Sequence, residues 1–216
     1  VSAVENNYYQ VPACGWNETH NITAKIPSMS GIWVNFTDIE SAIEYARPNV
    51  SEGKEAVFYC KPETDLGAQT HNAVNFSFTI YGNGAYISGG EHDFSIDTDD
   101  YPPTLTSGIT MNVYNLTNLK FWGGRSTSNT VNISIDGCTY DGIGAIMFRT
   151  DDSDGLKSII NINIKNTSFR GGSDSLVHTI HSGTVHIDNC TFEDSPAPVN
   201  IAYKGDGGSI LLNINK

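Results

Sequence analysis

Hydrophobic and polar residues alternate through several stretches in the C-terminal half of the chain. In each stretch every second residue is isoleucine or valine, and most residues between them are asparagine, serine, threonine or aspartate. Alternation with a period of two predicts β-strands with one buried face. We expect the buried faces to contain Val131, Ile133 and Ile135, then Ile160, Ile162 and Ile164, then Val185 and Ile187.

A short phrase recurs beside these stretches: a small or polar pair followed by an aromatic residue. It reads NLKF at 118–121, GCTY at 137–140, NTSF at 166–169 and NCTF at 189–192. The aromatic residues are 19, 29 and 23 positions apart. This spacing suits one coil of a solenoid, so we expect the aromatic residues to form a column at a corner of the coils.

A helical pattern precedes the strands, over residues 37–47. Thr37 or Asp38 can cap its N-terminus, and Pro48 with Gly53 is expected to end it. A helix at this place would cover the apolar end of a solenoid. The residues expected on its buried face are Ile39, Ala42, Ile43 and Ala46.

The N-terminal half carries segments that are similar to a known family. The helix is followed by a short strand at 56–60, a polar loop and the stretch FTIYGNGAYISGG, and a later coil reads GTVHIDNCTF. This order resembles secreted right-handed parallel β-helix proteins of the pectate-lyase-like (pectin lyase-like) superfamily, over residues 37–216. The resemblance implies an all-β fold: a right-handed parallel β-helix (solenoid) with one N-terminal capping α-helix and coils from about residue 56 onward. Residues 1–36 are expected to form an arm or irregular cap.

The charge balance argues against two classes of partner. The net charge is −12, and the 12 lysine and arginine residues are not clustered. Nucleic-acid binding and attachment to an anionic membrane both depend on basic residues. No apolar run reaches the length of a membrane span. The chain begins at Val1, as a secreted chain does after removal of its signal peptide, so we expect a secreted, extracellular or cell-surface location.

Asparagine-x-serine/threonine sequons are more frequent than chance placement gives. They favour a secreted, N-glycosylated protein whose glycans lie on exposed surface. The alternative is that asparagine and threonine occur together at solenoid turns for structural reasons. The sequons lie at Asn17, Asn21, Asn35, Asn49, Asn75, Asn115, Asn132, Asn166 and Asn189.

The four cysteines test the register of the repeat. Cys138 and Cys190 hold equivalent places, with Thr167 in the coil between them. Two coil spacings place them roughly 9–10 Å apart, beyond the reach of a disulfide, so both are expected to be buried free thiols. A Cys138–Cys190 disulfide would require the coil around Thr167 to be looped out. A disulfide between Cys14 and Cys60 would attach the arm to the first coil.

The segment TDDSDG at 150–155 is the sharpest acidic cluster. Polygalacturonase-type β-helix hydrolases use paired carboxylates near a basic residue, and Asp151, Asp152 and Arg149 are the candidates here. The further motifs of those enzymes, a Gly-His-Gly turn and an Arg-x-Lys pair, are not found. A solvated loop is the favoured interpretation, ahead of a calcium site and of a catalytic pair.

A second acidic segment lies at 91–110. Its carboxylates are weak candidates for Ca²⁺ ligands, but no lysine or arginine lies within the segment to take a proton, as a lyase would need. A solvated acidic turn is favoured. The candidate ligands are Asp97, Asp99 and Asp100, with Asp93 nearby.

Three histidines, His178, His181 and His186, could indicate a metal site or a general base. His178 and His181 flank a turn, and His186 occupies an outward strand position. Surface or ladder histidines are therefore favoured, and no cofactor is expected.

The last segment, 209–215, reads as a strand with Ile210, Leu212 and Ile214 alternating. An uncapped solenoid end exposes apolar core and favours association. Three alternatives stay open for this end: the chain is truncated, another copy stacks on it, or a neighbour's arm completes it by strand addition. The sequence favours a non-catalytic structural or adhesive protein that assembles with copies of itself into an extracellular filament or surface layer. The alternatives are a carbohydrate-active enzyme, and a viral or cell-surface glycan-binding module that uses exposed Trp122, Tyr140 or Tyr203.

Overall fold

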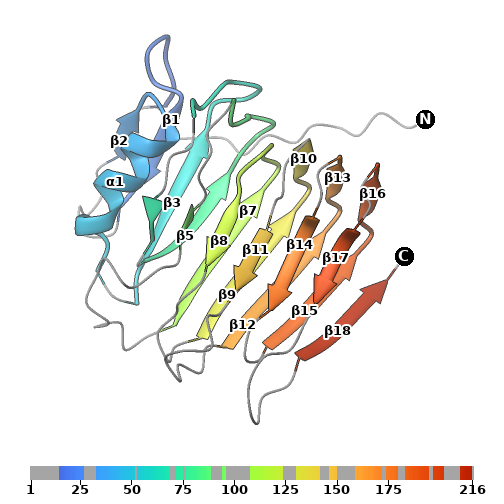
Figure 1. The fold of residues 1–216 in the computed structure, drawn as a ribbon. Helices are drawn as coiled ribbons and strands as arrows, with labels where there is room; N and C mark the ends of the chain where they lie inside the picture. Colours follow the sequence, from blue (N-terminus) through green and yellow to red (C-terminus); the bar gives the residue numbers. More distant parts are fainter. Residues whose placement is uncertain are drawn as a thin grey trace.

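The computed structural model shows a protein that is mostly β, with a long parallel sheet (Figure 1). Its described part contains 18 strands and one helix. The described residues are 15–26, 33–51, 53–68, 72–74, 76–88, 94–95, 108–123, 130–141, 146–149, 159–171, 174–179, 183–194, 197–201 and 210–215.

The strands form three sheets. The nine-stranded sheet has the order β18 (Ile210–Asn215), β15 (Gly183–Asp188), β12 (Ile159–Lys165), β9 (Thr130–Asp136), β7 (Ile109–Tyr114), β5 (Ser77–Tyr81), β3 (Glu55–Cys60), β1 (Ile22–Lys25) and β2 (Trp33–Phe36). The six-stranded sheet has the order β17 (Ala197–Ile201), β14 (Asp174–Thr179), β11 (Ile146–Arg149), β8 (Phe121–Gly123), β6 (Phe94–Ser95) and β4 (Asn72–Ala73). The three-stranded sheet has the order β10 (Thr139–Asp141), β13 (Ser168–Arg170) and β16 (Thr191–Glu193).

From β9 onward the chain visits the three sheets in a fixed rotation. β9, β10 and β11 lie in the nine-, three- and six-stranded sheets, and the next two sets of three strands repeat that order. Each strand from β9 to β15 pairs in parallel with the strand three places later. Figure 1 shows the strands advancing across the molecule, from α1, β1 and β2 at one end to β18 at the other. This topology is consistent with a β-solenoid.

Inward-facing side chains of the nine-stranded sheet form rows of like residues. The isoleucines and valines predicted to be buried in β9, β12 and β15 are all at most 3% exposed. Burying each side chain contributes about 1.5–3 kcal/mol to the free energy of unfolding. These side chains all belong to one continuous core. One such row follows the register from strand to strand through Phe58, Ile80, Val113, Ile135, Ile164 and Ile187.

The predicted aromatic column exists in the three-stranded sheet. Tyr140 stacks on Phe169 with ring centroids 5.2 Å apart, and Phe169 stacks on Phe192 at 4.9 Å. Tyr140 is 1% exposed, so its proposed role as an exposed glycan-binding residue is wrong. Register places it inward, on the same side as Phe169.

The fourth aromatic of the repeat, Phe121, does not belong to this column. It lies in β8 of the six-stranded sheet, where it pairs with Ile146. The residue equivalent to Thr139 one coil earlier is Thr117, as their bridge shows. The alignment of 118–121 with 137–140 was therefore three residues out of register.

The predicted helix is α1 (Ile39–Asn49). Asp38 caps its N-terminus, and its Oδ1 accepts from Ser41 N at 2.8 Å. The four predicted apolar residues are fully buried and belong to the main core cluster. The helix does not end before Pro48, which lies inside its last turn; it ends where Val50 N donates to Ala46 O at 2.9 Å.

The N-terminal segment is more regular than expected. Within residues 1–36, predicted to be an arm or irregular cap, β1 and β2 form an antiparallel pair that extends the nine-stranded sheet. β1 also pairs antiparallel with β3. Short strands with little alternation left no periodic signal, since residues 22–24 are all buried.

The hydroxyl of Tyr140 is buried and has no hydrogen-bond partner among the described residues, and burial raises its pKa well above the ordinary value. Tyr140→Phe should therefore raise the free energy of unfolding by about 1 kcal/mol, since it removes a desolvated polar group. Denaturant titration measures this change. Phe169→Tyr, which adds a hydroxyl to the same column, should lower the free energy of unfolding. A clear loss of stability in Tyr140→Phe would show that the hydroxyl is bonded.

Candidate functional site

The outer face of the nine-stranded sheet carries the polar residues of the alternating stretches. Because the strands pair in register, outward residues align across the sheet in three rows. The amide row contains Asn132, Asn161 and Thr184. The central row contains Asn112, Ser134, Asn163 and His186. The end row contains Tyr114, Asp136, Lys165 and Asp188.

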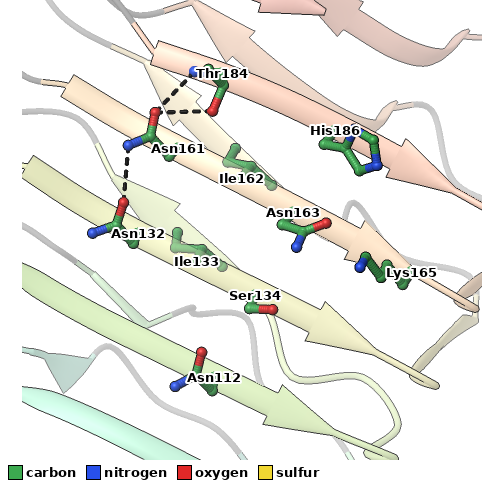
Figure 2. Close-up of a pocket in the computed structure, with 10 residues that line it drawn as sticks. All are labelled: Asn112, Asn132, Ile133, Ser134, Asn161, Ile162, Asn163, Lys165, Thr184 and His186. Carbon is green, nitrogen blue, oxygen red and sulfur yellow. Dashed lines mark hydrogen bonds between the residues drawn. The ribbon is translucent and has the colours of Figure 1, made fainter. Parts of the chain in front are cut away.

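A groove of about 480 Å³ lies on this face, across β7, β9, β12 and β15. Figure 2 shows side chains of the three rows converging on it from these four strands. Apart from Lys165 and His186, its lining side chains carry no ionisable group. The lining residues are Asn112, Asn132, Ile133, Ser134, Asn161, Ile162, Asn163, Lys165, Thr184 and His186.

The amide row is joined by its own hydrogen bonds. Asn161 Nδ2 donates to Asn132 Oδ1 at 2.9 Å (Figure 2). Thr184 donates to Asn161 Oδ1 from both its backbone N, at 3.1 Å, and its hydroxyl, at 3.0 Å. The row is therefore held in one arrangement, with the Nδ2 group of Asn132 at its end.

The central row is not satisfied in the same way. Asn163 Oδ1 is buried and has no donor within the described part of the chain. Asn112 is anchored at one side, since its Nδ2 donates to Thr79 Oγ1 at 3.1 Å and the Thr79 hydroxyl donates to Glu55 Oε1. A buried amide oxygen without a donor costs free energy, which a ligand donor at this place would recover.

The end row changes character along the sheet. Tyr59, Tyr81 and Tyr114 stack with centroids 5.2 and 5.4 Å apart. In the next coils the row continues as aspartate, lysine and aspartate, with Lys165 between Asp136 and Asp188 in the register. Of this row only Lys165 lines the groove, with Asp136 and Asp188 beside it in the register.

The turns that follow the long strands explain several sequons. Asn115, Asn166 and Asn189 have φ of 48°, 49° and 48°, and Gly137 has the same place with φ of 66°. This left-handed conformation favours asparagine and glycine. Asn189 Nδ2 donates to Asn166 Oδ1 at 2.7 Å, and Asn166 Nδ2 donates to Asp136 Oδ1 at 2.8 Å. The structural explanation of the sequons therefore applies to these positions.

The other sequons lie in varied settings. Asn17 is exposed, and its Oδ1 accepts from Thr19 N at 2.8 Å. Asn21 Nδ2 donates to Thr37 O at 3.0 Å, and Asn49 Nδ2 donates to Tyr45 O at 2.7 Å. Asn35 Oδ1 accepts from the Thr23 hydroxyl. Asn132 lines the groove, and Asn75 lies outside the described residues.

The cysteines act as part of the same turns. Cys138 Sγ lies 3.6 Å from Asp136 O and Cys190 Sγ 3.3 Å from Asp188 O, while the Thr167 hydroxyl donates to Lys165 O at 2.7 Å. Both are free thiols, as predicted. Cys138 is buried as expected, whereas Cys190, also expected to be buried, is only half-buried. Burial raises the pKa of Cys138 to about 12 and also raises the pKa of Cys190, so both thiols stay neutral near pH 7.

Cys60, the last residue of β3, is unpaired among the described residues and fully buried, and burial raises the pKa of its thiol. Its predicted partner, Cys14, lies outside the described residues. The disulfide between them stays a prediction.

The structure does not describe the side chains of the predicted catalytic and calcium residues. Asp151, Asp152 and the calcium candidates Asp97, Asp99 and Asp100 lie outside the described residues, and Arg149 is placed only as part of the backbone of β11. His178 is placed in the backbone of β14, His181 lies outside, and His186 has the predicted outward position. Trp122 is placed in the backbone of β8, and Tyr203 lies outside. The enzyme alternative remains a prediction.

Most groove residues were missed from the sequence, although one signal identifies them. Searching for clustered acids, histidines and cysteines passes over neutral amides and hydroxyls. Aligning the outward residues of the alternating stretches at 130–136, 159–165 and 183–188 would have brought Ser134, Asn163 and His186 into one row.

Comparison with known proteins gives no relative: no family model, no curated protein and no solved structure matches the chain. Within its described part, no helix is long and apolar enough to cross a membrane. The same residues contain no group of three or more histidine, cysteine, aspartate or glutamate side chains placed to hold a metal ion.

Asn166 tests how far the turn depends on the left-handed conformation. Asn166→Gly should cost little conformational energy, because Gly137 occupies the equivalent turn naturally. Asn166→Ala should lower the free energy of unfolding by about 1–2 kcal/mol more than Asn166→Gly. Thermal or denaturant unfolding measures the difference. Both variants lose the ladder bonds to Asp136 and Asn189, so equal destabilisation would mean that the ladder, and not the backbone conformation, dominates.

Proposed function

We propose that the chain is a right-handed parallel β-helix from a secreted, N-glycosylated, non-catalytic protein with a structural or adhesive role, and that its adhesive contact is carbohydrate binding in the groove. The pectate-lyase-like resemblance and the rotation of strands through three sheets support this fold. The observation that carries the function is the groove itself, whose neutral amides and hydroxyls come from four rigidly paired strands.

The chemistry of the groove suits a hydroxyl-rich ligand. Sugar hydroxyls both donate and accept, as do the asparagine, serine and threonine side chains that line it. Lys165 adds a donor at one border, between the Asp136 and Asp188 carboxylates. Those carboxylates and the net charge of −12 disfavour an acidic ligand, so a neutral saccharide fits better.

Self-assembly into a filament or surface layer is the second part of the proposal, and it rests on the exposed edge strand β18. Leu211 and Ile214 of β18 are 57% and 58% exposed. Exposed apolar residues on an edge strand favour association. Nothing in the structure shows what covers them.

Asn163→Ala should abolish or weaken carbohydrate binding at least about tenfold, because Asn163 supplies the unbonded amide oxygen of the groove. Retention on a panel of immobilised neutral polysaccharides measures the loss. The same variant should not lower the unfolding midpoint, since the oxygen it removes is buried and has no donor to lose among the described residues.

Lys165→Ala and Lys25→Ala form a matched pair for that experiment. Both lysines lie on the nine-stranded sheet, but Lys25 is an exposed residue of β1, away from the groove. Only Lys165→Ala should weaken retention. If the unaltered protein binds no member of the panel, the carbohydrate-binding function is wrong.

N-glycosylation has its own test in protein recovered from a secretory host. Glycans should occupy Asn17 and Asn115, which are exposed. Asn132, Asn166 and Asn189 should be unoccupied, since the first lines the groove and the others donate through Nδ2 to the ladder. Mass spectrometry of peptides before and after N-glycosidase treatment reports the occupied sites. An unchanged mass contradicts the proposal.

A further inference from the structure

We propose that the groove binds an extended, neutral β-1,4-linked glycan that runs across the strands, with one sugar residue over each of the four lining strands. This inference rests on the proposed carbohydrate-binding function and specifies the linkage and direction of its ligand.

The direction follows from the central row. Asn112 pairs with Ser134, Ser134 with Asn163, and Asn163 with His186, each on the adjacent strand. The row is therefore perpendicular to the strands, and its members repeat at the strand spacing of about 4.8 Å. A ligand lying along it meets a polar side chain once in each strand spacing.

The linkage follows from the same spacing. In a β-1,4-linked chain of glucose or mannose type, both bonds leave the ring equatorially, so the chain is nearly straight and each sugar is about as long as the strand spacing of about 4.8 Å. An α-1,4-linked chain curves away from a straight row. An extended peptide rises only about 3.3–3.4 Å per residue, so its residues do not keep step with a row spaced at about 4.8 Å.

The borders of the groove complete the recognition. On one side the amide row is fixed by its own hydrogen bonds and ends in the Nδ2 group of Asn132. On the other side Lys165 lies in the end row, paired in register with Asp136 and Asp188. Figure 2 shows Asn132 and Lys165 on opposite sides of Asn163. Between them, Asn163 Oδ1 lacks a donor within the described part of the chain, and a sugar hydroxyl is a suitable one.

Calorimetric titration with cello-oligosaccharides tests the proposal. Affinity should rise roughly threefold to tenfold with each sugar from cellobiose to cellotetraose, as each adds hydrogen bonds to one more strand. It should change little from cellotetraose to cellohexaose, because the groove spans four strands. Maltohexaose, which has the same sugar with α-1,4 linkage, should bind at least about tenfold more weakly than cellohexaose.

Two variants locate the ligand. Asn163→Ala, in the middle of the groove, should lower cellotetraose affinity about tenfold. Asn213→Ala is the matched control, because Asn213 is paired with His186 on the next strand, β18, and lies outside the groove lining. Its affinity for cellotetraose should be unchanged.

The outcomes separate this inference from the proposed function. Binding to other glycans, without the length dependence or with maltohexaose preferred, overturns the extended-chain inference and leaves carbohydrate binding intact. Binding to no glycan overturns both. Binding of an extended peptide in place of any glycan, lost in Asn163→Ala, overturns both and assigns the groove to a protein partner.

Discussion

In-register parallel pairing in the nine-stranded sheet is the constraint on which the rest of the structure depends. Each strand from β3 to β18 places its residues directly over those of its neighbour. Hence a residue type that is favourable in one coil is favourable in the next. Inside, this stacks isoleucine and valine into unbroken rows. At the corner it stacks Tyr140, Phe169 and Phe192 within 5.2 Å of one another in succession.

The turn after each long strand must repeat as faithfully as the strands do. Three coils use asparagine with positive φ and one uses glycine. The following residue closes the turn by bonding to the carbonyl two positions earlier, whether it is Cys138, Thr167 or Cys190. The asparagine of the sequons at 115, 166 and 189 is therefore explained by the turn conformation, although the same triplets also read as glycosylation sites. Whether the asparagine side chain is bonded to the neighbouring turn, as at 166 and 189, distinguishes a structural asparagine from a glycosylation site.

The sequence predicted the parts of the fold that follow from periodicity. Alternation identified the buried rows, and 3.6-residue spacing with Asp38 identified α1. It failed where register or backbone context decides. Phe121 matches the repeat by type but lies in another sheet, and Pro48 remains inside the helix. Tyr140 looked accessible because tyrosine is amphipathic, yet its register places it in the core. The groove was missed because neutral amides carry no recognisable motif and act only when register assembles them.

The groove itself follows from how the outward rows are bonded. Where asparagine lies over asparagine, as at 132 and 161, the amides reach each other and bond at 2.9 Å, so the row needs nothing further. In the central row Ser134 lies between Asn112 and Asn163. A hydroxyl can bond across neighbouring strands, since Asn112 Nδ2 donates to Thr79 Oγ1 at 3.1 Å, but no hydrogen bond joins Ser134 to Asn163 Oδ1 in the described structure. The amide oxygen beside Ser134 therefore remains without a donor there, and it is the polar atom of the groove that a ligand would bind.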